Sequence, residues 1–91
     1  MTTNGLWSEG IYVQLDQLGN HRVVGSTREA LEVLMHSWPV DGGVECILAV
    51  LTCREVLDGN RPASDGRKSF IDALDEARLV WHIISVGDGA G

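Results

Sequence analysis

Apolar and polar residues alternate at the start of the chain, where the apolar side chains share one parity: Trp7, Ile11, Val13 and Leu15. Alternation with a period of two, carried by β-branched and aromatic residues, is typical of a half-buried strand. Gly10 predicts a bulge or bend within it. Gly19 and Asn20 tolerate the positive φ that a hairpin turn requires, and residues 22–25 return as a second short strand. The pattern therefore predicts an N-terminal β-hairpin.

The spacing of apolar residues changes to that of a helix after Gly25. Ser26 stands three residues before Glu29, and this capping-box arrangement lets each side chain satisfy a backbone N–H at the start of a helix. Pro39 disfavours the helical conformation for the residue before it. The first helix is therefore expected to begin at Ser26 and to end near Ser37.

A second helix is predicted over residues 43–58, where apolar residues lie on most of the circumference. Such a helix is expected to be central and to touch more than one layer of the fold. The small residues Ala49 and Cys53 would allow a neighbouring helix or the sheet to approach closely. A third helix follows, with Ser64 as the expected N-cap. Gly66 in its first turn costs about 1 kcal/mol relative to alanine.

Residues 79–86 are rich in β-branched and aromatic types and predict a C-terminal strand that is apolar on both faces. A strand of this kind is either covered on both sides or meets a partner chain. The expected fold class is α+β: the N-terminal β-hairpin and this strand form a small antiparallel sheet packed on three α-helices. Residues 1–5 and 87–91 are expected to be flexible tails of a single small domain that spans residues 1–91.

The charge of the chain bounds its partners. The formal net charge is −6, with thirteen acidic residues against seven basic ones, and Lys68 is the only lysine. Nucleic-acid binding rests on clustered basic residues that neutralise phosphates, so we expect no nucleic-acid partner. No apolar run approaches the ~20 residues of a membrane span, and the first residues lack the regions of a signal peptide. We therefore expect a cytoplasmic protein without a membrane partner.

The two cysteines indicate neither a disulfide nor a metal site nor a reactive thiol. Cys46 and Cys53 share the second predicted helix, which places their Cα atoms ~10 Å apart, whereas a disulfide needs less than ~7 Å. With His36 they match none of the paired spacings of zinc sites, so neither a metal nor a cofactor is expected. Cys46 comes closest to a reactive thiol because it follows a helix N-terminus, but its apolar surroundings favour a buried, inert group. No catalytic residue is expected, and the sequence favours a protein that is not an enzyme.

The elbow between the first two helices is the most promising place for a site. It places an aromatic residue, a histidine and an acid beside a glycine pair. The candidate ligand-binding or partner-binding residues are His36, Trp38 and Asp41 at this elbow and Trp81 in the last predicted strand. Tryptophan is a common anchor of protein interfaces. The simpler interpretation of Trp38 is that it closes the end of the core where the two helices diverge.

Several ordered pieces of the chain carry a family resemblance: the strand pair leading into residues 26–31, then Trp38-Pro39 with Gly43, then Ala49 and Cys53, and last Arg67-Lys68-Ser69-Phe70-Ile71 ahead of Glu76-Ala77. In this order, over roughly residues 7–79, the chain resembles a family of small bacterial proteins of unknown function, the domain-of-unknown-function family 982. Gly66 stands where this family looks to prefer alanine. The resemblance implies that the chain shares the fold of this family, and it implies no activity, substrate or catalytic residue.

Two functions stay open. The first is a non-enzymatic protein-binding or regulatory module, which would associate with a protein partner or with itself as a homodimer. Its contact would be made through residues 79–86 or through the apolar excess of the second helix, because a chain of this length has a small core that self-association can support. The alternative is a small-molecule-binding protein or a small enzyme that uses the elbow between the first two helices.

Overall fold

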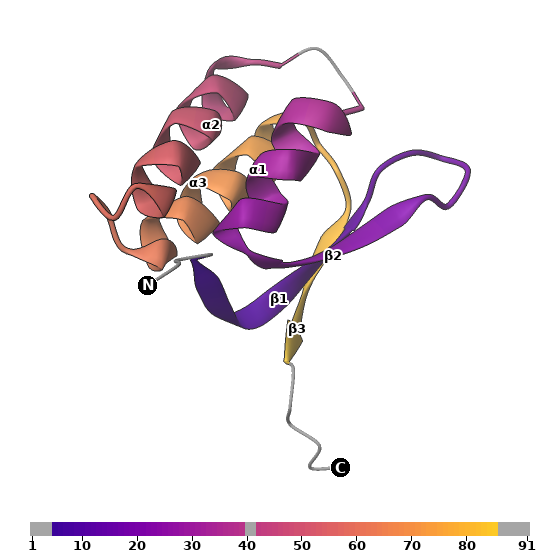
Figure 1. Cartoon of the computed structure of the whole chain (residues 1–91). Coiled ribbons are helices and arrows are strands. Elements are labelled where there is room, and N and C mark those ends of the chain that lie inside the picture. Colours follow the sequence, from indigo (N-terminus) through magenta and orange to yellow (C-terminus); the bar gives the residue numbers. More distant parts are fainter. Residues whose placement is uncertain (1–4, 40–41, 86–91) are drawn as a thin grey trace.

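The computed structural model describes residues 5–39 and 42–85. Its elements follow the order β1 (Leu6–Gln14), β2 (His21–Ser26), α1 (Thr27–His36), α2 (Val44–Leu57), α3 (Ala63–Glu76) and β3 (Trp81–Ser85). The strands form one antiparallel sheet in the order β2-β1-β3, and the helices lie together on one side of it (Figure 1). The predicted α+β fold, with a hairpin and a C-terminal strand packed on three helices, is confirmed.

The hairpin sets the register of the sheet. β1 pairs antiparallel with β2, with Tyr12 opposite Val23. The register shifts between Leu6 and Ile11, in the stretch that holds the bulge predicted at Gly10, because more residues of β1 than of β2 fall between the two paired positions. The hairpin and its irregularity were therefore both readable from the alternation and from the glycine within it.

The turn between β1 and β2 is organised by one carboxylate. Asp16 Oδ1 accepts hydrogen bonds from the backbone N–H groups of Leu18 (2.8 Å) and Asn20 (3.2 Å), and the Asn20 side chain donates to Oδ2. These bonds, the one from the Asn20 side chain foremost, lower the pKa of Asp16. Gly19 has a φ of +93°, a conformation that glycine adopts without steric cost. Gly19 thus takes the positive φ expected in this turn, whereas Asn20 does not and acts through its hydrogen bonds to Asp16.

The last strand is shorter than the predicted range of 79–86. α3 ends in a turn in which the Leu79 N–H donates to the Leu74 carbonyl (3.0 Å) and Arg78 adopts a φ of +59°. This arrangement holds Leu79 at the helix end, so that β3 begins at Trp81 and pairs antiparallel with β1. Val86 lies outside the described residues. The strand order, which the sequence leaves open, places β1 in the middle of the sheet.

The core lies between the inner face of the sheet and the helices. Its fully buried side chains come from β1, β2 and all three helices: Ile11, Val13, Val24, Ala30, Val33, Ala49, Cys53, Phe70, Ala73 and Leu74. α1 contacts β2 and α3 contacts β1, whereas α2 packs mainly on α3 and α1. Ala49 and Cys53 are the small residues predicted to allow a close approach, and both are fully buried.

The predicted central position of the second helix is wrong. α2 is covered on one side by α3 and α1, and its other side is exposed even though that side carries large apolar residues. A helix that is apolar all round can be buried on every side only if enough chain is available to cover it. Here the sheet is already covered by α1 and α3, so α2 is left at the outside of the described fold.

The start of α1 is fixed by the predicted cap and by one buried hydroxyl. Ser26 Oγ accepts from the Glu29 N–H (3.1 Å), and Glu29 Oε1 accepts from the Gly25 N–H (2.7 Å). The Thr27 hydroxyl, fully buried, donates to the Gly5 carbonyl (3.2 Å). Gly5 is itself buried and so departs from the expectation of a loose segment over residues 1–5. The rest of both predicted tails, residues 1–4 and 87–91, lies outside the described residues.

α3 begins two residues earlier than predicted. Its N-cap is Pro62 and not Ser64, because the Pro62 carbonyl already accepts the Asp65 N–H (3.0 Å) and Ser64 has entered the first turn. Gly66 is buried, and a Cβ at this position would lie 3.0 Å from both Cγ2 and Oγ1 of Thr27. The glycine that weakens α3 therefore lets the helix pack closely against the start of α1.

Candidate functional site

An apolar strip runs along the outer side of α2. Val44, Ile47, Leu48 and Leu51 are 66%, 58%, 47% and 55% exposed. Their spacing of three, four and seven residues places them on one face over about 10 Å of helix axis. We call these four residues the α2 stripe. The opposite side of the same helix is buried and carries Cys46, Ala49, Thr52, Cys53 and Val56.

The N-terminus of α2 is held by a carboxylate from α3. The N-cap residue Gly43 has no side chain to cap the helix, and Glu76 Oε1 accepts instead from the N–H groups of Glu45 (3.1 Å) and Cys46 (3.4 Å). A Cβ on Gly43 would lie 2.5 Å from the same oxygen. A side chain at residue 43 would therefore displace the Glu76 carboxylate from the helix terminus. The contact between Glu76 and the first N–H groups of α2 fixes the start of the stripe relative to α3.

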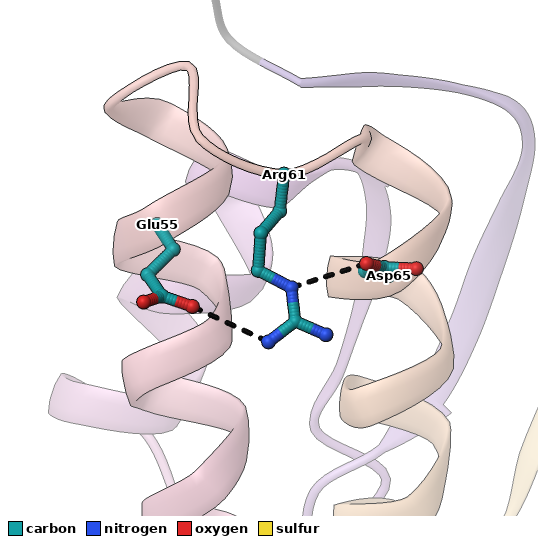
Figure 2. A network of polar contacts seen from close by, with 3 residues as sticks. All are labelled: Glu55, Arg61 and Asp65. Atoms are coloured by element: carbon teal, nitrogen blue, oxygen red, sulfur yellow. Dashed lines mark hydrogen bonds and ion pairs between the residues drawn. The ribbon is translucent and has the colours of Figure 1, made fainter.

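The other end of α2 is tied to α3 by an arginine. Figure 2 shows Arg61 between the two helices: its Nη1 lies 3.3 Å from Glu55 Oε1 on α2, and its Nε lies 3.1 Å from Asp65 Oδ2 on α3. These hydrogen bonds, with that to Asp65 foremost, raise the pKa of Arg61. The orientation of α2 is therefore fixed at both ends by polar contacts to α3, with the stripe facing away.

The charges around the stripe differ between its two ends. Two carboxylates, Glu45 and Glu76, lie at the N-terminal end of α2. Arg54 lies beyond the C-terminal end of the stripe, where its Nη2 contacts Met35 Sδ of α1 (3.6 Å). The stripe itself has no charged member. It is a neutral apolar surface with carboxylates at one end and a guanidinium at the other.

The exposed side chains of the stripe forgo the free energy that their burial would contribute. Full burial of a Val, Leu or Ile side chain stabilises by about 1.5–3 kcal/mol, and the four side chains of the stripe are each about half exposed. Covering them would therefore release about 3–6 kcal/mol for each copy of the surface. Apolar residues exposed singly are ordinary, but a contiguous group marks an interaction surface.

The two cysteines lie beneath the stripe as free, buried thiols. Burial raises the pKa of Cys53 to about 12, and burial together with the charge of Glu76 raises the pKa of Cys46. A reactive thiol needs the opposite shift, because the thiolate is the nucleophile. The helix N-terminus near Cys46 thus does not activate it, since Glu76 already occupies that end of the helix.

The candidate residues from the sequence fall in different places. Trp38 is half-buried, with its ring centroid 6.3 Å from that of Phe70, as expected if it closes the end of the core. Trp81 Nε1 donates to Asp75 Oδ1 (2.9 Å) at the end of α3. His36 is exposed on the last turn of α1. Asp41 lies outside the described residues, so the convergence expected at the elbow stays a prediction.

Among the clefts of the described part of the chain, two lie away from the stripe. One, of about 500 Å³, is at the end of the sheet and is lined by the β1–β2 turn, Pro39 and residues 78–80. Arg78, with its φ of +59°, belongs to this sheet-end cleft. The other, of about 390 Å³, is lined by β1 and the start of α3, where Arg67 Nε donates to the Glu9 carbonyl (3.4 Å). Neither cleft is lined by His36, Trp38 or Trp81.

The sequence already contained the signal for the stripe. The spacing of Val44, Ile47, Leu48 and Leu51 is that of one helical face, but the opposite face is apolar as well. Periodicity alone cannot tell which of two apolar faces is covered. The small residues Ala49 and Cys53 decide it, because a helix packs most closely where side chains are short.

No helix of the described ranges is long and apolar enough to span a membrane.

The comparisons with known proteins agree with this architecture of three helices on a three-stranded sheet. A family model described as "Protein of unknown function (DUF982)" matches residues 9–81, and the chain belongs to this family. The NMR structure of the Agrobacterium tumefaciens protein Atu1219 is similar, with a TM-score of 0.69 and 29% identity over 86% of this chain and 78% of that one. Among curated proteins we found no match.

Proposed function

We propose that this protein is a non-enzymatic protein-binding module and that the α2 stripe is its interface. The observation that carries the proposal is the exposure of four large aliphatic side chains on one face of a helix whose two ends are fixed. Protein interfaces are apolar at their centre and polar at their rim. The stripe has this arrangement, with carboxylates and a guanidinium at its ends.

Two further features support binding over catalysis. The thiols nearest the stripe have raised pKa values, which disfavours their use as nucleophiles. The stripe is also convex and uniform, because it is one face of a single helix. Such a surface suits a helix or a shallow groove of another protein, whereas small-molecule sites are concave.

The proposal is tested with a photo-crosslinking amino acid, p-benzoylphenylalanine, placed at Ile47 in the native host. The matched control carries it at Leu18, which is 89% exposed in the β1–β2 turn. We expect an adduct of defined mass from position 47 that is absent from position 18 and is lost when Leu51→Glu is added. Adducts that are identical at both positions, or none at either, would contradict the proposal. Peptide mass spectrometry of the adduct identifies the partner.

A second candidate function, the binding of a small carboxylate in the sheet-end cleft, is favoured by one observation. Arg78 occupies a left-handed position at the end of α3 that glycine takes more readily, and it lines this cleft with Pro39 of the elbow. Arg78→Gly would relieve the backbone at this position and remove the guanidinium. NMR titration with acetate and with succinate should shift residues 14–17 and 78–80 in the wild type and not in Arg78→Gly. Equal shifts in both would exclude this function.

A further inference from the structure

We infer that the partner of the α2 stripe is a second copy of this chain, bound with the two α2 helices antiparallel about a two-fold axis. This inference rests on the proposed function, since it names the occupant of the same surface. It would give a homodimer in which α2, at the outside of the single chain, becomes the centre of the assembly. In the dimer, α2 would then have the central position that its sequence predicts.

The stripe is complementary to itself. A two-fold axis between Ile47 and Leu48 places Val44 of one copy opposite Leu51 of the other, and Ile47 opposite Leu48. Every apolar position then meets an apolar position and no charge is placed opposite one. In an interface of this kind each residue contributes twice, so eight half-exposed aliphatic side chains would be covered together.

The charges at the ends favour the antiparallel arrangement over the parallel one. In the parallel arrangement the N-terminal ends of the two α2 helices, each with the carboxylates of Glu45 and Glu76 close to it, would lie side by side. In the antiparallel arrangement this end lies near Arg54 of the second copy, whose guanidinium contacts the sulfur of Met35 within the described part of the chain. Antiparallel packing also opposes the two helix dipoles favourably.

The size of the surface sets the expected affinity. A stable interface buries about 800 Å² on each partner, and one helix face of two turns provides only part of this. Each copy also carries a net charge of −6, which opposes association. We therefore expect a dissociation constant between about 10 μM and 1 mM, in the range of weak, reversible dimers.

Sedimentation equilibrium of the purified full chain from 10 μM to 2 mM, in 150 mM salt with reducing agent, tests the inference. The weight-average mass should rise from monomer to dimer for the wild type. Ile47→Glu and, independently, Leu51→Glu should raise the dissociation constant at least tenfold, because each places a charge within the apolar stripe. Leu18→Glu makes the same chemical change at a distant exposed position and should leave it unchanged. Circular dichroism establishes that each variant is folded.

Three outcomes overturn the inference. They are a wild type that stays monomeric to 2 mM, a dimer that Ile47→Glu and Leu51→Glu leave intact, and a dimer that is lost instead in Ile83→Glu. Ile83 is half-exposed on the edge strand β3, and its sensitivity would indicate pairing of sheets. The proposed function fails separately: a monomer that still gives a stripe-dependent cross-link to a different protein would retain the binding module and exclude self-association.

Discussion

At the scale of single residues, Thr27 connects the start of the chain to the first helix. Its hydroxyl donates to the Gly5 carbonyl and accepts from the Trp7 indole N–H (3.1 Å), and its backbone N–H donates to the same carbonyl (2.9 Å). Because Thr27 is fully buried, water cannot replace these bonds. One hydroxyl therefore fastens both β1 and the residue before it to α1.

Thr27→Val keeps the shape of this side chain and removes its hydrogen bonds. We expect the free energy of unfolding in urea to fall by about 1–2 kcal/mol, because the Trp7 N–H loses its partner in a partly buried setting. The control is a double-mutant cycle with Trp7→Phe, which removes the donor beforehand. Thr27→Val should cost less in that background. An equal cost in both backgrounds would show that the Trp7 bond contributes nothing.

Cys53 makes stability depend on alkaline pH. Burial raises its pKa from an ordinary value of 9.0 to about 12, so the fold favours the neutral thiol. The corresponding stability is fully present below pH 9 and is lost as pH rises from 9 towards 12, because the unfolded chain ionises first. Urea unfolding between pH 8 and pH 10.5 should show wild-type stability falling more steeply than that of Cys53→Ala. Parallel pH profiles of the two proteins would refute this.

At the scale of elements, local signals were sufficient where a contact is local. The capping box at Ser26 and Glu29 and the turn at Gly19 each involve residues within four positions, and both were predicted. The start of α3 was misplaced because Ser64 is a good N-cap residue, whereas the turn closes at Pro62 through a backbone bond that the side-chain type does not reveal.

The cap of α2 could not be predicted because it comes from a distant element. Glu76 lies 31 positions beyond Glu45, to whose N–H it bonds, and from the sequence it belongs to a solvated helix face. The strand order could not be predicted for the same reason, since the pairing of β3 with β1 depends on where the three helices bring the end of the chain. Sequence patterns give the elements of this fold, and contacts between distant elements give their arrangement.

Glu76→Ala should destabilise the protein by about 1 kcal/mol, as the loss of a helix N-cap does. It should also speed the alkylation of Cys46, because the charge of Glu76 contributes to the raised pKa of that thiol. Thermal or urea unfolding and iodoacetamide labelling measure the two effects. Glu32→Ala on the exposed side of α1 is the control and should change neither by a measurable amount. A thiol reactivity unchanged in Glu76→Ala would contradict this account of the α2 terminus.

At the scale of the whole molecule, the described chain has more apolar helix surface than it can cover. The sheet takes α1 and α3, and α2 keeps one apolar face against them and one against solvent. The surplus of apolar residues on this helix was visible in the sequence. The sequence alone does not show that this surplus lies on the outside and forms a candidate site, because burial depends on which helices pack against the sheet.

The central claim, that a second copy covers the α2 stripe, is tested most directly by isotope-filtered NOE spectroscopy. A mixture of ¹³C-methyl-labelled and unlabelled protein at about 1 mM would contain mixed dimers at the affinity expected from the size of the surface. We predict intermolecular NOEs between Ile47 and Leu48 and between Val44 and Leu51. Intermolecular NOEs confined to β3, or their absence from a sample that sedimentation shows to be dimeric, would contradict the claim.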